Sequence, residues 1–128
     1  MSSINKILED LNKEQKEAVL NTEGPNLVVA GAGSGKTRVL TTRLAHIINE
    51  KKAWPNQILC VTFTNKAAKE MQNRVMKYVE GRSNSVPWLG TFHSISVKIL
   101  RRHAEALEYK SNFTILDTDD QKKLIRKI

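Results

Sequence analysis

The sequence has little of what stabilises secreted proteins or inserts proteins into membranes. Its only cysteine is Cys60, so an internal disulfide is excluded. No apolar stretch approaches the roughly 20 residues that a membrane-spanning helix needs, and the N-terminus has no apolar signal region. We therefore expect a cytoplasmic protein without a membrane partner. Cys60 lies in the apolar run 58–61, which predicts a small core residue rather than a reactive thiol.

Metal-ligand clusters and acidic residues are also scarce. The three histidines lack cysteine or carboxylate companions at ligand spacing, so we expect no transition-metal site. There are 13 acidic residues against 21 lysines and arginines, which gives a formal net charge of +8. Residues 60–128 carry 13 basic and 7 acidic residues, whereas residues 1–59 carry 8 and 6. This excess favours a polyanionic partner through counterion release, although a basic surface can also serve solubility alone.

Three of the six glycines lie in one run, AGAGSGKT, over residues 30–37, directly after the apolar segment 27–29. Glycines can adopt positive φ, so successive N–H groups can form a concave nest for an anion. A helix starting there adds free N–H groups and its positive dipole end. The run predicts a triphosphate-binding loop, with Ala30 in place of the first glycine of G-x-x-x-x-G-K-[S/T]. The alternative is a glycine-rich turn without a ligand.

The loop assigns a role to each of its residues. Lys36 is expected to contact the β and γ oxygens of a bound triphosphate and Thr37 to ligate Mg²⁺, so these two are the candidate catalytic residues. The candidate nucleotide-binding residues of the loop are Ala30, Gly31, Ala32, Gly33, Ser34, Gly35, Lys36 and Thr37.

Apolar periodicity predicts alternating strands and helices. Strand-like runs cover residues 27–29, 58–62 and 86–91. Helical spacing occurs over residues 4–11, 13–21 after the candidate N-cap Asn12, 36–52, 68–79, 93–107, and 118–128 after the candidate N-cap Asp117. This alternation predicts an α/β fold with a parallel sheet, right-handed crossovers and helices on the faces of the sheet.

Two loops should leave the sheet at the same edge as the phosphate loop, because ligands of parallel sheets bind at the carboxyl ends of strands. Both combine an aromatic ring with hydroxyl, amide or imidazole groups next to basic helices, which is typical of a track for single-stranded nucleic acid. The candidate residues are Phe63, Thr64, Asn65, Thr91, Phe92, His93 and Ser94. The alternative is that both phenylalanines are core residues and the basic residues form a solvated helix face.

Four segments, in order, resemble motifs of the UvrD, PcrA and Rep group of superfamily 1 DNA helicases. They are LNKEQKEAV (residues 11–19), which is similar to the Q motif, AGAGSGKT (30–37) to the Walker A motif, VTFTNKAAKEM (61–71) to motif Ia, and GTFHS (90–94) to motif Ib. The resemblance runs from about Leu11 to the end of the chain. It implies that Gln15 reads the adenine edge, that Arg38 packs near the base, and that the two aromatic loops contact DNA. Gln15 also has the spacing of a capping box with Asn12, and the two roles are compatible.

The resemblance implies a RecA-like P-loop NTPase sheet with flanking helices. Residues 1–108 would be the N-terminal part of the first RecA-like ATP-binding domain, and residues 109–128 the start of a helical insertion. The family's magnesium-binding Asp-Glu pair and its later arginines have no counterpart in this sequence. Asp117 follows the apolar run 113–116, as the first acid of that pair would follow its strand. Thr118 rather than glutamate comes next, which disfavours Asp117 as a magnesium ligand.

We therefore expect a truncated piece of an ATP-driven 3′ to 5′ DNA helicase that acts in DNA repair or replication, with the remaining helicase domains absent. Its partners would be single-stranded DNA and duplex junctions, and uncovered apolar surface would allow self-association. Without the acid pair and the arginines, it should bind ATP weakly and hydrolyse little of it. The alternatives are a related recombination nuclease-helicase, a P-loop phosphotransferase, and a DNA-binding module with a vestigial nucleotide site.

Overall fold

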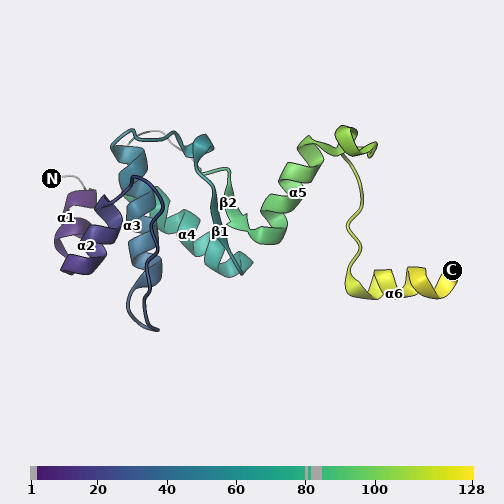
Figure 1. The fold of residues 1–128 in the computed structure, drawn as a ribbon, viewed down its shortest axis with the longest axis horizontal. Coiled ribbons are helices and arrows are strands. Elements are labelled where there is room, and N and C mark those ends of the chain that lie inside the picture. Colours follow the sequence, from purple (N-terminus) through teal and green to yellow (C-terminus); the bar gives the residue numbers. More distant parts are fainter. Residues whose placement is uncertain (1–2, 80, 82–84) are drawn as a thin grey trace. The chain divides into compact units, whose positions relative to one another are not determined.

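The structure is a computed structural model that describes residues 3–79, 81 and 85–128. It consists of two compact units, Met1–Phe92 and His93–Ile128. The helices and strands of the first unit are α1 (Ser3–Glu9), α2 (Lys13–Leu20), α3 (Lys36–Asn49), β1 (Cys60–Thr62), α4 (Asn65–Tyr78) and β2 (Leu89–Thr91), and a 3₁₀ turn covers Pro55–Gln57 (Figure 1).

The two strands form a parallel pair connected through α4. Cys60 lies opposite Leu89 and Thr62 lies opposite Thr91. A parallel pair requires a crossover connection, which α4 supplies here. The predicted α/β class, with a parallel sheet and helices, is therefore confirmed for the described residues.

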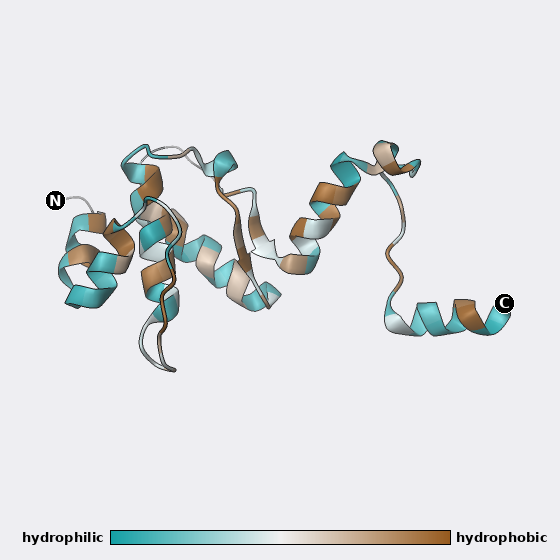
Figure 2. Cartoon of the chain, in the orientation of Figure 1, coloured by the Kyte–Doolittle hydropathy of each residue, from teal (hydrophilic) through white to brown (hydrophobic). Residues whose placement is uncertain are grey.

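One apolar cluster joins the sheet to α3 and α4. It consists of Leu44, Cys60, Met71, Val75 and Val86. Residues four positions apart lie on the same face of a helix, which explains why Met71 and Val75 of α4 are buried together. Figure 2 shows the corresponding contrast between the hydrophobic colour of β1 and the mixed colours of α4. The predicted helical stripe of 68–79 thus faces the core, and Cys60 is a core residue as expected.

The apolar segment 27–29 is not a strand, so the prediction of a strand there is wrong. Leu27 and Val29 are 91% and 90% exposed. A strand needs a neighbour that accepts and donates its backbone hydrogen bonds, and in the described part of the chain β1 and β2 pair only with each other. The apolar composition of the segment therefore predicted burial in a sheet, but the segment has no strand partner and is exposed.

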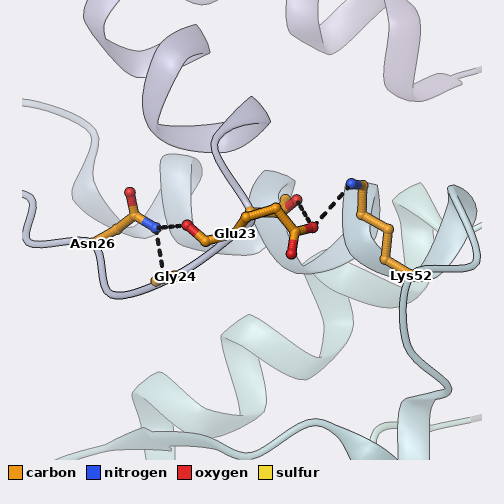
Figure 3. Close-up of polar contacts among 5 residues, drawn as sticks. Glu23, Gly24, Asn26 and Lys52 are labelled. Atoms are coloured by element: carbon orange, nitrogen blue, oxygen red, sulfur yellow. Dashed lines mark hydrogen bonds and ion pairs between the residues drawn. The ribbon is translucent and has the colours of Figure 1, made fainter.

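Polar contacts hold the turn that leads into this segment (Figure 3). The Asn26 Nδ2 atom donates to the carbonyl oxygens of Gly24 and Glu23, at 2.9 and 3.2 Å. The Lys52 ammonium lies 3.4 Å from a carboxylate oxygen of Glu23. Gly24 has a φ of 68°, which glycine adopts without a Cβ clash. The turn after α2 is therefore connected to the residues that follow α3, although an exposed ion pair stabilises such a contact only slightly.

The second unit contains three helical segments. It includes α5 (Phe92–Arg102) from His93 onward, a 3₁₀ turn at Ala104–Leu107, and α6 (Thr118–Lys127). The helix predicted over 93–107 thus ends as an α-helix at Arg102, and the segment 113–116 is extended without strand pairing. Asp117 is the N-cap of α6, as predicted, because its Oδ1 atom accepts from the Asp120 N–H at 2.7 Å. The domain boundary expected after residue 108 stays a prediction.

We expect Met71→Ala to destabilise the first unit, because it leaves a cavity between α4 and the strands. The Met71 side chain is 3% exposed, and large-to-small substitutions at such positions cost about 2–5 kcal/mol. Urea unfolding followed by circular dichroism would measure the free energy of unfolding. The control is Lys69→Ala, at an exposed position of the same helix, which should change it by less than about 0.5 kcal/mol. Equal losses for both variants would contradict this assignment of the core.

Candidate functional site

The glycine-rich run 30–37 forms a loop that ends where α3 begins. Lys36 is the first residue of α3, and Gly35 is its N-cap. Gly33 and Gly35 have φ values of 73° and 80°, so these two glycines use the positive φ that glycine allows, whereas the φ of Gly31 is not positive. The Ser34 N–H donates to the Gly31 carbonyl at 3.2 Å and closes the turn inside the loop.

The start of α3 has the properties of an anion site. The first N–H groups of a helix have no acceptor within the helix, and the positive end of the helix dipole lies there. Gly35 provides no side chain to cap these groups. Lys36 and Thr37 follow in the first turn, and both are exposed. Backbone N–H groups, an ammonium group and a hydroxyl are therefore available together at one helix end.

A cavity of about 510 Å³ lies beside this loop. It lies between α2 and α3 and extends to the residues that precede the loop, and Gln15, Lys36 and Arg43 are among the residues that line it. Small-molecule sites in proteins typically have volumes of about 300–1,000 Å³ and combine apolar walls with a few polar groups. The apolar walls here include Ala18 and Val39. The cavity thus has the size and lining of a ligand site.

Gln15 connects the cavity wall to the loop. Its Oε1 atom accepts from the Asn12 N–H at 3.0 Å, and the Asn12 Oδ1 atom accepts from the Gln15 N–H at 2.8 Å, which completes the capping box weighed in the sequence. Its Nε2 atom donates to the Ser34 carbonyl at 2.9 Å. Sequence reasoning missed this last contact, because no periodicity relates residues 19 positions apart. The contact with adenine stays a prediction.

Two arginines of α3 contact the N-terminal segment of the chain. The Arg38 guanidinium lies 3.6 Å from the Asp10 carboxylate, next to the end of α1. The Arg43 Nη1 atom donates to the Ala18 carbonyl of α2 at 2.8 Å. The expected contact between Arg38 and a nucleotide base stays a prediction. Sequence reasoning missed Arg43, because its acceptor is a backbone atom that any residue could supply.

Phe63 and Phe92 follow β1 and β2 directly and lie against each other. Their ring centroids are 5.5 Å apart, and the rings are tilted by 45°. The side chains are 89% and 53% exposed, so the alternative that both belong to the core is wrong. Because Thr62 and Thr91 are paired, both rings leave the same edge of the sheet. The segment before the phosphate loop is outside the sheet, so a shared edge with that loop stays a prediction.

The other candidate residues of the two loops have different environments. Thr64 is the N-cap of α4, and its hydroxyl accepts from the Ala67 N–H at 3.1 Å. Asn65 is exposed and begins α4, whereas Thr91 is only 7% exposed. His93 and Ser94 belong to the second unit, in the first turn of α5.

Three further observations concern the thiol, the metal-ligand groups and the helix lengths of the described residues. Burial raises the pKa of the Cys60 thiol, which keeps it neutral and weakly nucleophilic. Among the residues that the structure describes, no group of three or more His, Cys, Asp or Glu side chains is placed to hold a metal ion. Within the same residues, no helix has the length and apolar character needed to span a bilayer.

Comparisons with known proteins give a consistent result. Residues 11–128 match the family described as UvrD/REP helicase N-terminal domain. The chain is 53% identical over 125 residues to a Staphylococcus aureus (strain Mu50) protein named ATP-dependent DNA helicase PcrA. It is 52% identical over 125 residues to a protein of the same name from Staphylococcus epidermidis (strain ATCC 12228). Each alignment covers 98% of this chain and 17% of the relative. The chain thus spans about a sixth of the length of the curated relatives it matches.

We expect Gly35→Ala to destabilise the loop by about 1–2 kcal/mol, the cost of a left-handed backbone for a residue with a Cβ atom. Gly35 has a φ of 80°, and an added Cβ would lie 3.2 Å from the Gln15 Nε2 atom. Gly31→Ala is the control in the same loop, because its φ is not positive and its Cβ would meet no atom within 4 Å. Urea unfolding should show a clear loss for the first variant only. A larger loss for Gly31→Ala would contradict this loop conformation.

Proposed function

Since the chain belongs to the UvrD/REP helicase N-terminal domain family, we propose that it is the ATP-binding, single-stranded-DNA-contacting part of a 3′ to 5′ ATP-dependent DNA helicase. The observation that carries the proposal is the start of α3 at Lys36, directly after two glycines with positive φ and beside a cavity of about 510 Å³. Such a helix start binds phosphate groups through backbone N–H groups and its dipole. The helicase would act in DNA repair or replication, in the cytoplasm of cells such as the staphylococci of its relatives.

In this proposal, the phosphates of ATP lie over the start of α3. The Lys36 ammonium neutralises the β and γ oxygens, while the N–H groups of the loop and of the first helical turn donate to them. The exposed Thr37 hydroxyl is a hard oxygen donor, which suits Mg²⁺ together with phosphate oxygens and water. When bound, the metal would neutralise phosphate charge. Gln15 would read the adenine edge, and Arg38 would pack near the base after leaving Asp10.

The same proposal assigns the finer architecture. Residues 1–108 would form the N-terminal part of a RecA-like domain, and residues 109–128 the start of a helical insertion. In a complete RecA-like sheet, further strands would cover the edges of the β1–β2 pair. The exposure of segment 27–29 in the first unit also favours self-association of the isolated chain.

DNA would contact the rings of Phe63 and Phe92. Two exposed rings at one sheet edge offer stacking faces for unpaired bases. Asn65, His93 and Ser94 would donate hydrogen bonds to the DNA backbone. Buried Thr91 would act by fixing the strand end rather than through direct contact. Duplex junctions would follow as substrates, because a helicase separates strands where single-stranded and duplex DNA meet.

We expect Lys36→Ala to weaken ATP binding by at least about tenfold, because a hydrogen bond to a charged group contributes about 1.5–3 kcal/mol. Isothermal titration calorimetry with Mg²⁺ and a non-hydrolysable ATP analogue would measure the Kd. Lys77→Ala, at an exposed position in the last turn of α4, is the matched control and should leave the Kd unchanged. Equal affinities for wild type and Lys36→Ala would instead support a vestigial nucleotide site.

We expect Phe63→Ala to weaken binding of a single-stranded oligonucleotide by about 5- to 100-fold, the range that corresponds to about 1–3 kcal/mol per stacked base. Fluorescence anisotropy with labelled oligothymidylate would measure it across several salt concentrations. The affinity of the wild type should fall steeply with salt, because lysines and arginines that neutralise phosphates release the counterions condensed on the DNA. Trp54→Ala removes another exposed aromatic ring and should have no effect. Salt-independent binding, or equal effects of both substitutions, would rule out this DNA surface.

A further inference from the structure

The helix α6 is exposed along its whole length. None of its residues is buried, although one side of it is largely apolar. Gln121, Leu124, Ile125 and Ile128 follow the spacing i, i+3, i+4 and i+7, which places them in one stripe along the helix. Figure 2 shows the corresponding hydrophobic band toward the C-terminal end of α6. A single exposed helix gains nothing from such a stripe, because apolar side chains stabilise only when they leave water.

The charges of α6 are divided between its two ends. Three carboxylates come first and four cations follow. They are Asp117, Asp119 and Asp120, and then Lys122, Lys123, Arg126 and Lys127. This order already suits a single helix, because acids at the N-terminus and bases at the C-terminus offset the helix dipole. It has a second consequence, since it makes α6 complementary in charge to another α6 that runs in the opposite direction.

One edge of the apolar stripe carries charges of both signs. A groove of about 410 Å³ follows this edge and is lined by Leu116, Asp120, Lys123, Leu124 and Lys127. Asp120 and Lys127 are seven residues apart, which is about two helical turns, so both lie on the same side of α6. Both side chains are exposed. The Asp120 carboxylate lies 4.0 Å from the Lys123 ammonium, a weak pair within the helix.

An antiparallel pair of two α6 helices uses the stripe and the charges together. In a two-fold pair every contact occurs twice, so Asp120 of each copy can lie opposite Lys127 of the other. The axis then passes beside Leu124, midway between positions 120 and 127, and brings the two Leu124 side chains together. A parallel pair would place acids beside acids and lysines beside lysines, which is unfavourable.

We propose that α6 is a self-association surface that pairs antiparallel with α6 of a second copy of this chain, through two Asp120–Lys127 ion pairs around a Leu124 contact. This surface is separate from the exposed segment 27–29, and it does not depend on the proposed nucleotide site. The interface is small, since stable interfaces bury more than about 1,000 Å². The dimer should therefore be weak, with a Kd on the order of 100 µM.

Charge reversal tests this pairing, with sedimentation equilibrium of the 128-residue chain as the measurement of the Kd. Asp120→Lys and Lys127→Glu should each weaken the homodimer at least about tenfold, because each variant brings like charges together twice. In an equimolar mixture of the two variants, both contacts join opposite charges. The mixture should therefore recover an affinity within about threefold of wild type. Leu124→Ala keeps a strong helix former and should weaken the dimer at least about tenfold.

Matched controls make the same changes in net charge on a helix of the first unit. Glu70→Lys and Lys77→Glu, at exposed positions of α4, should leave the Kd of the dimer within about twofold of wild type. Circular dichroism would verify that the helix content of each variant is unchanged. Binding of an ATP analogue should be equal in all α6 variants, so failure of this inference and failure of the proposed function are distinguishable.

Several results would overturn the inference. A wild-type chain that stays monomeric well above the expected Kd would exclude the dimer. An unchanged Kd in both charge variants, or a mixture that associates no better than either variant alone, would exclude the antiparallel contact. A dimer that is lost in Val29→Ser but kept in Leu124→Ala would assign the interface to segment 27–29 instead.

Discussion

The packing of α2 against α3 is the constraint on which the nucleotide site depends. Three polar contacts connect the N-terminal helices to α3 and its loop, namely those of Gln15 with the Ser34 carbonyl, Arg43 with the Ala18 carbonyl, and Arg38 with Asp10, of which the last is an exposed ion pair that stabilises only slightly. Two of them use backbone carbonyls as acceptors. Any residue type at position 18 or 34 would supply the same acceptor, so these two contacts do not depend on the side chains of Ala18 and Ser34. The cavity beside the loop exists because this packing leaves a space there.

The aromatic surface depends on a different constraint, which is the register of the parallel pair. Thr62 and Thr91 are partners, so the residues that follow them leave the sheet together. At the carboxyl ends of the two strands, Thr91 is buried and Thr62 is partly buried, whereas the next residues, Phe92 and Phe63, are exposed. An offset of one residue in either strand would move one ring to the opposite face. The rings are thus positioned by hydrogen bonds of the backbone rather than by their own packing.

Local features of the fold were predictable, and so was the parallel arrangement of β1 and β2, whereas other long-range features were not. Asn12 and Asp117 are the N-caps expected, because capping depends on residues only three positions apart. The segment 27–29 has the composition of a strand, but strand formation depends on a distant partner that composition cannot reveal. For the same reason the bond between Gln15 and Ser34 was missed. The motifs indicated which residues to examine, and their roles in binding ATP and DNA remain predictions.

The central claim is that the start of α3 and its loop bind the terminal phosphates of a nucleotide. The most direct measurement is the ¹H–¹⁵N spectrum of the chain during titration with inorganic triphosphate, which lacks a base and therefore reports on phosphate binding alone. The account predicts that the largest shifts occur at the amides of Gly33, Gly35, Lys36 and Thr37, which lie at the helix start. Shifts confined to the basic surfaces of α4 and α5, with these four amides unchanged, would contradict it.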